Sequence, residues 1–426
     1  MQNNPLKVVI INKSATGGGA AVAAKRLYEA LEVNGIKASM LVQDEIKDST
    51  SIQSLSNSKR EKRKSFLRFI QERLYFLPYE KNKSIRYSFS PAIAGIDISK
   101  HPLVQEADII HLHWINHGFL SIDTLEKLFA LGKPVVWTMH DMWPFTGGCH
   151  YAVACHEFIE SCGFCPFLRK SFKDDLSSRI HAKKRLVWKK ANLNAVSCSN
   201  WLGSIAQESS LLRQKKISSI PNPINTQVFS PKDSKKCREE LGLPKDKKLL
   251  LFGAANISDP RKGSKYLIES LNILDQKHPH LKDEFELVVF GKSNKKQLKR
   301  FPFKVNSMKF ISCTDELVKL YSAADAFVLP SLQDNLPNTV MESLACGVPV
   351  IGFRVGGVPE MIEHQKSGFL AEARDSESLA NGIVDVLFHD NLNSYKKAAR
   401  SFALDNFDNK VVADQYIALY SSLMNK

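Results

Sequence analysis

The sequence has no long apolar run and a shortage of acidic residues. No apolar stretch approaches the ~20 residues that a membrane-spanning helix needs, so a helical membrane protein is not expected. The first seven residues carry no charged-then-apolar leader and run into a predicted strand, which favours the cytoplasm. The 44 acidic residues are outnumbered by 59 basic ones, giving a formal net charge of +15. That excess favours polyanionic partners such as nucleotide phosphates or anionic lipid surfaces.

Nucleic-acid and dinucleotide motifs are also missing. No DNA- or RNA-binding signature accompanies the positive charge, so we expect no nucleic-acid partner. The absence of a G-x-G-x-x-G fingerprint argues against a nicotinamide dehydrogenase. No internal repeat of solenoid period is present, which argues against a repeat protein.

Two α/β domains are expected from the length and from a proline-rich interruption. At 426 residues the chain is too long for one hydrophobic core. The segment 221–231 contains three prolines and no periodicity, as is typical of a linker. We therefore predict an α/β first domain over 1–220, a second over 221–405, and a C-terminal helix within 406–426 that returns to the first domain. A cleft between the two domains follows from this plan.

The first domain opens with a predicted strand, a glycine-rich turn and a helix. The apolar strand covers 7–12, the turn contains Gly17, Gly18 and Gly19, and the helix extends from about 20 to 33. Glycines let a ligand approach the backbone, and the N–H groups at a helix start can bind a phosphate or a sugar hydroxyl. The alternative is a tight turn without a ligand.

A basic segment with regularly spaced apolar residues covers 59–90. It contains ten Lys or Arg residues and three Glu. Its apolar residues are spaced to form a stripe on a helix: Phe66, Leu67, Phe69, Ile70, Leu74, Phe76 and Leu77. Basic helices of this kind can lie on an anionic membrane surface. The alternative is that the stripe packs on the domain while the charges are solvated.

Histidines stand at the ends of two predicted strands. The first strand, 108–114, contains His111 and His113 on one face, and the second, 134–140, ends in His140 and Asp141. Polar residues at the carboxyl ends of α/β strands lie where substrates bind. A metal site made by the three histidines is an alternative that lacks evident carboxylate ligands.

Four of the eight cysteines fall within twenty residues: Cys149, Cys155, Cys162 and Cys165. The last two form a C-x2-C pair, and a structural metal, zinc above all, is one interpretation of the cluster. The spacing is not a common zinc pattern, and His150 and His156 are alternative ligands. Disulfides or free thiols are the other interpretation. In each case we expect a pinned loop beside the cleft and not a catalytic centre.

The stretch 330–351 is central to the second domain. A buried strand ends before Pro330, and a short helix opened by Pro337 and capped by Asn338 ends at Gly347. Its N-terminal N–H groups can bind an anion, and two carboxylates, Asp334 and Glu342, accompany it. The alternative is an ordinary βαβ unit with solvated acids.

Over nearly its full length the sequence resembles the family 4 glycosyltransferases of GT-B architecture. Asp334 and Glu342 match the family's E-x7-E motif, with Asp in place of the usual first Glu. The linker at 218–225 and the step Arg261-Lys262-Gly263 are also similar, although the family's arginine normally follows a glycine such as Gly253, where this chain has Ala254. The segments Gly-Gly-Gly-Ala-Ala, His-Leu-His-Trp and His-Asp-Met-Trp-Pro-Phe-Thr-Gly-Gly-Cys resemble a bacterial subgroup that builds capsular, colanic-acid-like or O-antigen polysaccharides.

The resemblance implies two Rossmann-like domains that face one another across the cleft and transfer a sugar from a nucleotide-diphosphate donor. It implies a lipid-linked or growing glycan as acceptor, retention of anomeric configuration, and a peripheral location at the inner membrane. Among the expected alternatives are a GT-B sugar-nucleotide epimerase and a non-catalytic assembly protein that binds glycan or membrane.

The resemblance also assigns roles to residues. Arg261 and Lys262, with the N–H groups of Asn338, Thr339 and Val340, are expected to stabilise the leaving diphosphate. Glu342 would bind the ribose, Asp334 and His140 would contact the transferred sugar, and Gly17 to Gly19 would close around donor phosphate or acceptor. The first domain has no Asp-x-Asp pair, so we expect catalysis without a metal or other cofactor.

Overall fold

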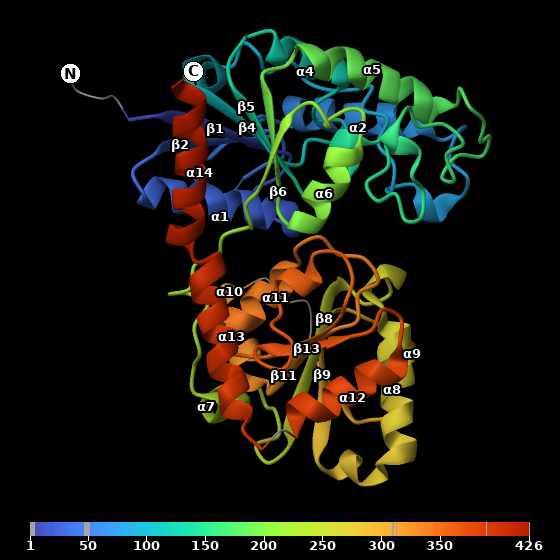
Figure 1. Ribbon diagram of the computed structural model, residues 1–426, viewed down its shortest axis with the longest axis vertical. Helices are drawn as coiled ribbons and strands as arrows, with labels where there is room; N and C mark the ends of the chain where they lie inside the picture. Colours follow the sequence, from blue (N-terminus) through green and yellow to red (C-terminus); the bar gives the residue numbers. More distant parts are fainter. Residues whose placement is uncertain (1–4, 47–51, 309–310, 312, 389, 426) are drawn as a thin grey trace. The chain divides into compact units, whose positions relative to one another are not determined.

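The computed structural model describes residues 5–46, 52–308, 311, 313–388 and 390–425 (Figure 1). The chain divides into two compact units. Unit 1 contains residues 1–221 and 412–426, and unit 2 contains residues 222–411. The first boundary therefore falls within the proline-rich segment 221–231. The predicted cleft between the domains stays a prediction.

Unit 1 is built on a seven-stranded sheet in the order β3-β2-β1-β4-β5-β6-β7, paired in parallel throughout. Helices cover both faces, which explains why its strands are continuous apolar runs. The strands are β1 (Lys7–Asn12), β2 (Lys37–Val42), β3 (Ile52–Ser54), β4 (Ile109–Leu112), β5 (Val135–Met139), β6 (Leu193–Ser197) and β7 (Lys216–Ser219).

The helices of unit 1 begin at recognisable caps. Ser58 and Glu61 form a capping box at the start of α2, and Asp175 accepts hydrogen bonds from the first N–H groups of α5. The helices are α1 (Gly19–Val33), α2 (Lys59–Phe76), α3 (Pro102–Glu106), α4 (Ile122–Phe129), α5 (Leu176–Lys190) and α6 (Asn200–Glu208).

The last helix of the chain, α14 (Asn409–Met424), packs on the sheet of unit 1. Val412, Ala413, Tyr416 and Tyr420 are fully or almost fully buried there with residues of β1, β2 and β4. The prediction that the C-terminal helix returns to the first domain is therefore confirmed (Figure 1).

Unit 2 is built on a second parallel sheet, of six strands in the order β10-β9-β8-β11-β12-β13. Its strands are β8 (Lys248–Asn256), β9 (Phe285–Lys292), β10 (Val305–Ser307), β11 (Ala326–Leu329), β12 (Val350–Phe353) and β13 (Gly368–Ala371). Its helices are α7 (Ser234–Glu240), α8 (Ser264–Lys277), α9 (Lys295–Leu298), α10 (Thr314–Ala323), α11 (Asn338–Ala345), α12 (Ser376–Leu387) and α13 (Leu392–Phe407). The predicted α/β class is confirmed in both units.

Candidate active site

Three loops meet at the carboxyl edge of the unit 2 sheet. The short helix η4 (Pro260–Lys262) follows β8, Asp334 lies in the loop after β11, and Gly356 and Gly357 turn the chain after β12. Because β8, β11 and β12 are neighbouring parallel strands, their carboxyl ends lie at one edge. Ligands of open α/β sheets bind at that edge.

Lys262 and Asp334, which are 72 positions apart, form an ion pair there. The ammonium of Lys262 donates to Oδ2 of Asp334 at 2.8 Å. The two side chains are 27% and 14% exposed, so the pair is held in place and remains accessible to a ligand. A cation of this kind can be aimed at a phosphate with little reorganisation.

Two glycines with positive φ allow the close backbone contacts of the loops that carry Lys262 and Asp334. A Cβ on Gly263 (φ 68°) would lie 1.7 Å from the carbonyl oxygen of Pro330, and one on Gly356 (φ 57°) would lie 1.9 Å from that of Asp334. Gly357 also donates its N–H to the Asp334 carbonyl at 3.1 Å. Only glycine permits these close approaches, so the loops carrying Lys262 and Asp334 are fixed against the strand ends.

Arg261 is oriented differently from Lys262. Its guanidinium bonds to Asp259 on the same loop, with Nη2 2.7 Å from Oδ2, and its side chain is half exposed. In this conformation Asp259 balances the charge of Arg261. The structure therefore pairs Lys262 with Asp334 and Arg261 with Asp259, and the role of Arg261 stays a prediction.

Glu342 lies one turn inside α11 and is 6% exposed. Its Oε2 accepts a hydrogen bond from the hydroxyl of Tyr321 at 3.0 Å. At the start of the helix, Pro337 occupies the N-cap and Asn338 is the first helical residue, so the expectation that Asn338 caps the helix is wrong. The fixed φ of Pro337 suits this position.

The first turn of α11 uses one of its own N–H groups. Val340 donates to the carbonyl of Pro337 at 3.0 Å. Of the three predicted donors, Asn338 and Thr339 are partly exposed, whereas Val340 is buried. Anion binding at this helix end would therefore rest mainly on its first two residues.

In unit 1 the glycine turn leads into α1. Gly17 and Gly18 have φ of 76° and 89°, and Gly18 occupies the N-cap without any side chain. Gly17, Gly18 and Gly19 are exposed, and no atom lies within 4 Å of a Cβ built on Gly17 or Gly18. The turn thus leaves the start of α1 open to a ligand.

His140 follows β5 and bonds to a second histidine. Its Nε2 lies 2.9 Å from Nδ1 of His113, and its Nδ1 lies 3.6 Å from Sγ of Cys198. The ring of His113 packs beside that of His111, with centroids 4.5 Å apart. The three predicted histidines are therefore adjacent.

The histidine group is fastened to α14. His111 bonds through Nδ1 to the hydroxyl of Tyr420 at 2.7 Å and through Nε2 to Oγ1 of Thr138 at 2.8 Å. Thr138 in turn bonds to the hydroxyl of Tyr416 at 2.9 Å. The C-terminal helix thus supports His111, whose ring packs beside that of His113, the hydrogen-bond partner of His140.

Burial keeps these histidines neutral, and this predicts acid sensitivity. It lowers the pKa of His111 to about 3, that of His140 to about 4, and that of His113 well below its usual value. The unfolded chain binds protons near pH 6.5 and the folded chain does not, so stability is lost as pH falls. We expect the free energy of unfolding to drop by up to about 1.4 kcal/mol per histidine and pH unit between pH 6.5 and 5.

Thermal unfolding followed by circular dichroism at several pH values measures this slope. A His280→Gln variant, which removes an exposed imidazole of unit 2, serves as control and should keep the slope. Equal stability at pH 6.5 and pH 5 would contradict the prediction.

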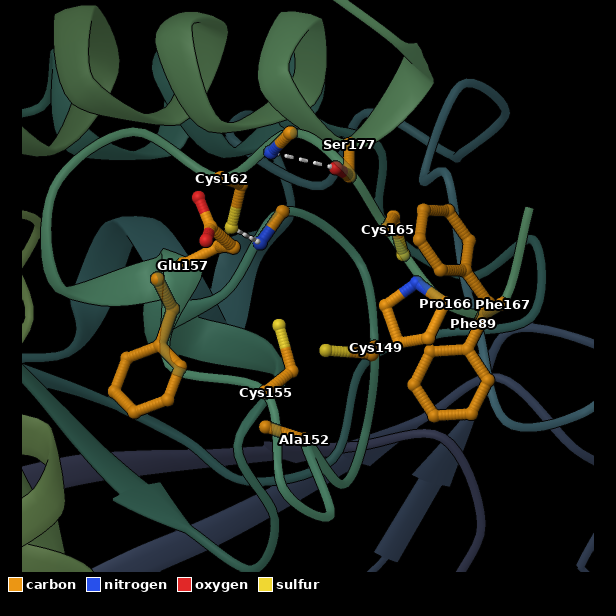
Figure 2. Close-up of a pocket in the computed structure, with 13 residues that line it drawn as sticks. Phe89, Cys149, Ala152, Cys155, Glu157, Cys162, Cys165, Pro166, Phe167 and Ser177 are labelled. Carbon is orange, nitrogen blue, oxygen red and sulfur yellow. Dashed lines mark hydrogen bonds between the residues drawn. The ribbon is translucent and has the colours of Figure 1, made fainter. Parts of the chain in front are cut away.

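The four clustered cysteines lie together in unit 1 and line one cavity (Figure 2). All are free thiols, and Cys149, Cys162 and Cys165 are buried. His150 is not available as a ligand, because its ring nitrogens bond to Asp141 at 2.7 Å and Ser90 at 2.9 Å. In the conformation of the described residues, no group of three or more His, Cys, Asp or Glu side chains is set to hold a metal ion.

The sequence did not reveal several residues that support the site. Asp259, Tyr321, Tyr416 and Tyr420 are contacts of Arg261, Glu342 or the histidine group, and no local motif marks them. Asp141, which the sequence placed at the end of its strand, accepts hydrogen bonds from His150 and from the indole of Trp114 at 3.0 Å. These two partners were not predicted.

Two family models match the chain. The model described as Glycosyltransferase Family 4 matches residues 17–228, and the model described as Glycosyl transferases group 1 matches residues 246–389. The first range contains the glycine turn and His140, and the second contains Lys262, Asp334 and Glu342.

Curated relatives include two bacterial enzymes. The N-acetyl-α-D-glucosaminyl L-malate synthase of Bacillus anthracis is 25% identical over 217 residues, which are 49% of this chain and 55% of the relative. The UDP-Gal:α-D-GlcNAc-diphosphoundecaprenol α-1,3-galactosyltransferase of Escherichia coli is 24% identical over 250 residues, 56% of this chain and 65% of the relative. The match thus spans less than two thirds of either relative.

A solved structure with the same fold is that of the Anabaena protein HepE in complex with UDP and glucose. The TM-score is 0.64 at 16% identity, with 98% of this chain and 100% of the other covered. This likeness shows the fold. Taken with the two family models, which together span both units, it shows that the chain belongs to the family 4 glycosyltransferases of GT-B fold.

Proposed function

We propose that this glycosyltransferase moves a sugar from a nucleotide-diphosphate donor to a lipid-linked or growing glycan in surface polysaccharide synthesis. The observation that carries the proposal is the accessible Lys262–Asp334 pair at the carboxyl edge of the unit 2 sheet. HepE was solved with UDP and glucose, and the E. coli relative is named for a diphosphoundecaprenol-linked acceptor. Both names support this class of donor and acceptor.

In the proposed reaction unit 2 binds the donor. Negative charge grows on the diphosphate as the sugar leaves, and Lys262 with the start of α11 would stabilise it. Arg261 would add charge if it turned away from Asp259. Glu342 would accept hydrogen bonds from the ribose, and Asp334 would contact the transferred sugar. No metal ion is required in this scheme.

Unit 1 would bind the acceptor and make the second contact to the transferred sugar. His140, held by His113, is a neutral group that can exchange hydrogen bonds with sugar hydroxyls. The glycine turn would close on donor phosphate or acceptor. We propose transfer on one face of the sugar, with the departing phosphate oxygen taking the acceptor proton and the anomeric configuration retained. A product of inverted configuration would exclude this scheme.

A screen of UDP-, GDP- and ADP-sugars by thermal shift and calorimetry tests the donor half of the proposal. A true donor should raise the melting temperature in a concentration-dependent way, because it binds only the folded chain. The best donor is then incubated with and without a polyprenyl-diphosphate-linked sugar. Conversion of the donor to a new nucleotide sugar without acceptor would identify an epimerase, and failure of every donor to bind would point to an assembly protein.

We also propose that α2 holds the enzyme at the inner membrane surface. Phe66, Leu67 and Leu74 are 60%, 53% and 62% exposed on α2, and basic residues such as Lys59 and Arg63 share that face. Phe76 and Glu72, on the opposite face, are buried. The apolar residues of the predicted stripe therefore fall into two groups. One group packs on unit 1, and the other is exposed. None of the helices formed by the described residues has the length and apolar character that crossing a bilayer requires.

Exchanging two exposed leucines for acids tests the membrane proposal. The double variant Leu67→Glu/Leu74→Glu should bind phosphatidylglycerol vesicles at least about tenfold more weakly, since it loses apolar insertion and gains repulsion. Co-sedimentation measures the binding. Val33→Glu, at an 85% exposed position of α1, is the matched control. Equal binding by the double variant and the control would exclude α2 as the contact.

A further inference from the structure

The cysteine cluster, whose four thiols the proposed reaction does not use, lies in the segment between β5 and α5. Its cysteines come from three separate turns of that segment. The sulfur atoms of Cys149 and Cys155 point toward one another, and that of Cys162 points into the same space (Figure 2). Cys165 lines the cavity together with them. Four thiols therefore line one small cavity.

The C-x2-C turn has an uncommon backbone. Cys162, Gly163 and Phe164 all have positive φ, at 54°, 120° and 45°. Non-glycine residues rarely adopt this region, and such conformations persist where the surroundings enforce them, often around a ligand. Here the turn keeps both of its cysteines at the cavity.

Backbone donors fix the positions of the two cysteines. The N–H of Gly147 points at Sγ of Cys162 at 3.1 Å, and the N–H of Cys165 donates to Oδ2 of Asp175 at 2.9 Å. Burial raises the pKa of the Cys162 thiol to about 12, and the N–H of Gly147 opposes this shift, because a thiolate is the better acceptor. Hydrogen bonds to ligand atoms of this kind are typical of metal sites.

The cavity is of the size of a single small guest. Its volume is about 10 Å³, which is the room of one water-sized sphere. Apart from the sulfurs its walls are mostly apolar, with Phe89, Ala152, Phe158, Pro166 and Phe167, and Glu157 and Ser177 line it as well. The four sulfurs are the ligands that a soft metal ion prefers.

We propose that unit 1 contains a structural zinc site made by four thiolates: Cys149, Cys155, Cys162 and Cys165. The four sulfurs are not set for a metal in the structure as it stands. Each cysteine sulfur is positioned by a single side-chain torsion, χ1, so the proposal requires these side chains to rotate onto the ion. On binding, each thiol gives its proton to solvent, and Zn²⁺ with four thiolates carries a net charge of −2.

Lys184 lies buried beside this site. It is completely buried on α5, and its amine donates to the carbonyl of Thr146 at 3.0 Å and lies over the Trp143 ring at 3.3 Å. Burial lowers the pKa of Lys184 well below its usual value, whereas negative charge on Cys162, Cys149 or Asp141 acts to raise it. Two thiolates in the cluster would therefore favour the charged form of Lys184.

The zinc site would stiffen the support of His140. The segment that carries the cysteines also carries His150, which bonds to Asp141, the residue after His140. It further accepts the N–H of Met142 at its own carbonyl, at 2.9 Å. Fixing the cysteine loop therefore fixes the turn after β5. The metal site itself does not depend on the proposed reaction.

Metal analysis of the purified full-length chain tests the proposal. After gel filtration in metal-free buffer we expect one zinc per chain by inductively coupled plasma mass spectrometry. Titration with a mercurial reagent should release that zinc in step with the blocking of four thiols. Removal of zinc by a chelator should lower the melting temperature by about 5 °C or more, and added Zn²⁺ should restore it.

Variants separate the cluster from the other cysteines. Cys162→Ser should lose zinc, whereas Cys313→Ser, at an exposed cysteine of unit 2, should keep it. If Cys162→Ser does not fold, the mercurial titration of the unmodified chain still decides. Zinc near zero in a folded chain with four reactive thiols, iron in place of zinc, or a disulfide within the cluster by peptide mass spectrometry would each overturn the proposal.

Discussion

Replacing Lys262 with alanine is expected to lower the rate of sugar transfer by a factor of about 10² or more. The ammonium is the charge placed 2.8 Å from Asp334 and accessible at the carboxyl edge of the unit 2 sheet. Its loss would remove a preorganised contact to the growing charge of the diphosphate. It would also leave Asp334, which is 14% exposed, as an unbalanced anion that repels the donor.

The rate is measured with the donor found in the thermal-shift screen, and the melting temperature is recorded beside it. Lys265→Ala is the matched control, because Lys265 lies three positions on, is 72% exposed and pairs only loosely with Glu269 at 3.7 Å. The control should retain full activity. A Lys262→Ala enzyme that is folded and as fast as the control would remove Lys262 from the proposed mechanism.

Gly263→Ala should also reduce transfer by about 10², although it removes no charged group. A methyl group at this position would lie 1.7 Å from the carbonyl oxygen of Pro330. The backbone on both sides would have to move apart, and η4 would carry Lys262 away from Asp334. Displacements of about 1 Å in a catalytic contact produce losses of this order.

The control for this variant distinguishes the cost of a left-handed backbone conformation from the displacement of Lys262. Gly242 has a similar φ, 64°, but no atom lies within 4 Å of a Cβ built on it. Gly242→Ala should therefore cost only about 1–2 kcal/mol of stability from the left-handed backbone and keep its activity. Equal activity of the two variants, at equal folded fraction, would show that the contact with Pro330 does not position Lys262.

The strands and the glycine turns could be predicted because their causes are local. Continuous apolar runs such as those of β1, β5 and β11 are typical of the buried strands of a parallel sheet. The sequence pattern does not predict helix α13, because its buried face is made largely of Ala399 and Ala403, with Tyr395 and Phe407 at its ends. Alanines give a weak periodic signal, and the packing of unit 2 decides that this face is buried.

The site was predictable where a motif fixes both residue type and spacing. Lys262, Asp334 and Glu342 were named from such motifs, and the structure brings the first two together. The orientation of Arg261 was not predictable, because it depends on whether Asp259 or a more distant acid captures the guanidinium. Asn338 was expected to cap α11, but Pro337 precedes it with its φ already fixed and takes that position.

The sequence by itself determined the two α/β units, the basic helix with an apolar stripe and the residues of the family motifs, because all of these depend on composition and short-range order. The tertiary structure decided the pairing of side chains. The contacts of Lys262 with Asp334, of His140 with His113 and of His111 with Tyr420 join residues 72, 27 and 309 positions apart. Such pairs arise only when sheet order and helix packing bring distant loops to one edge, and no local pattern encodes that.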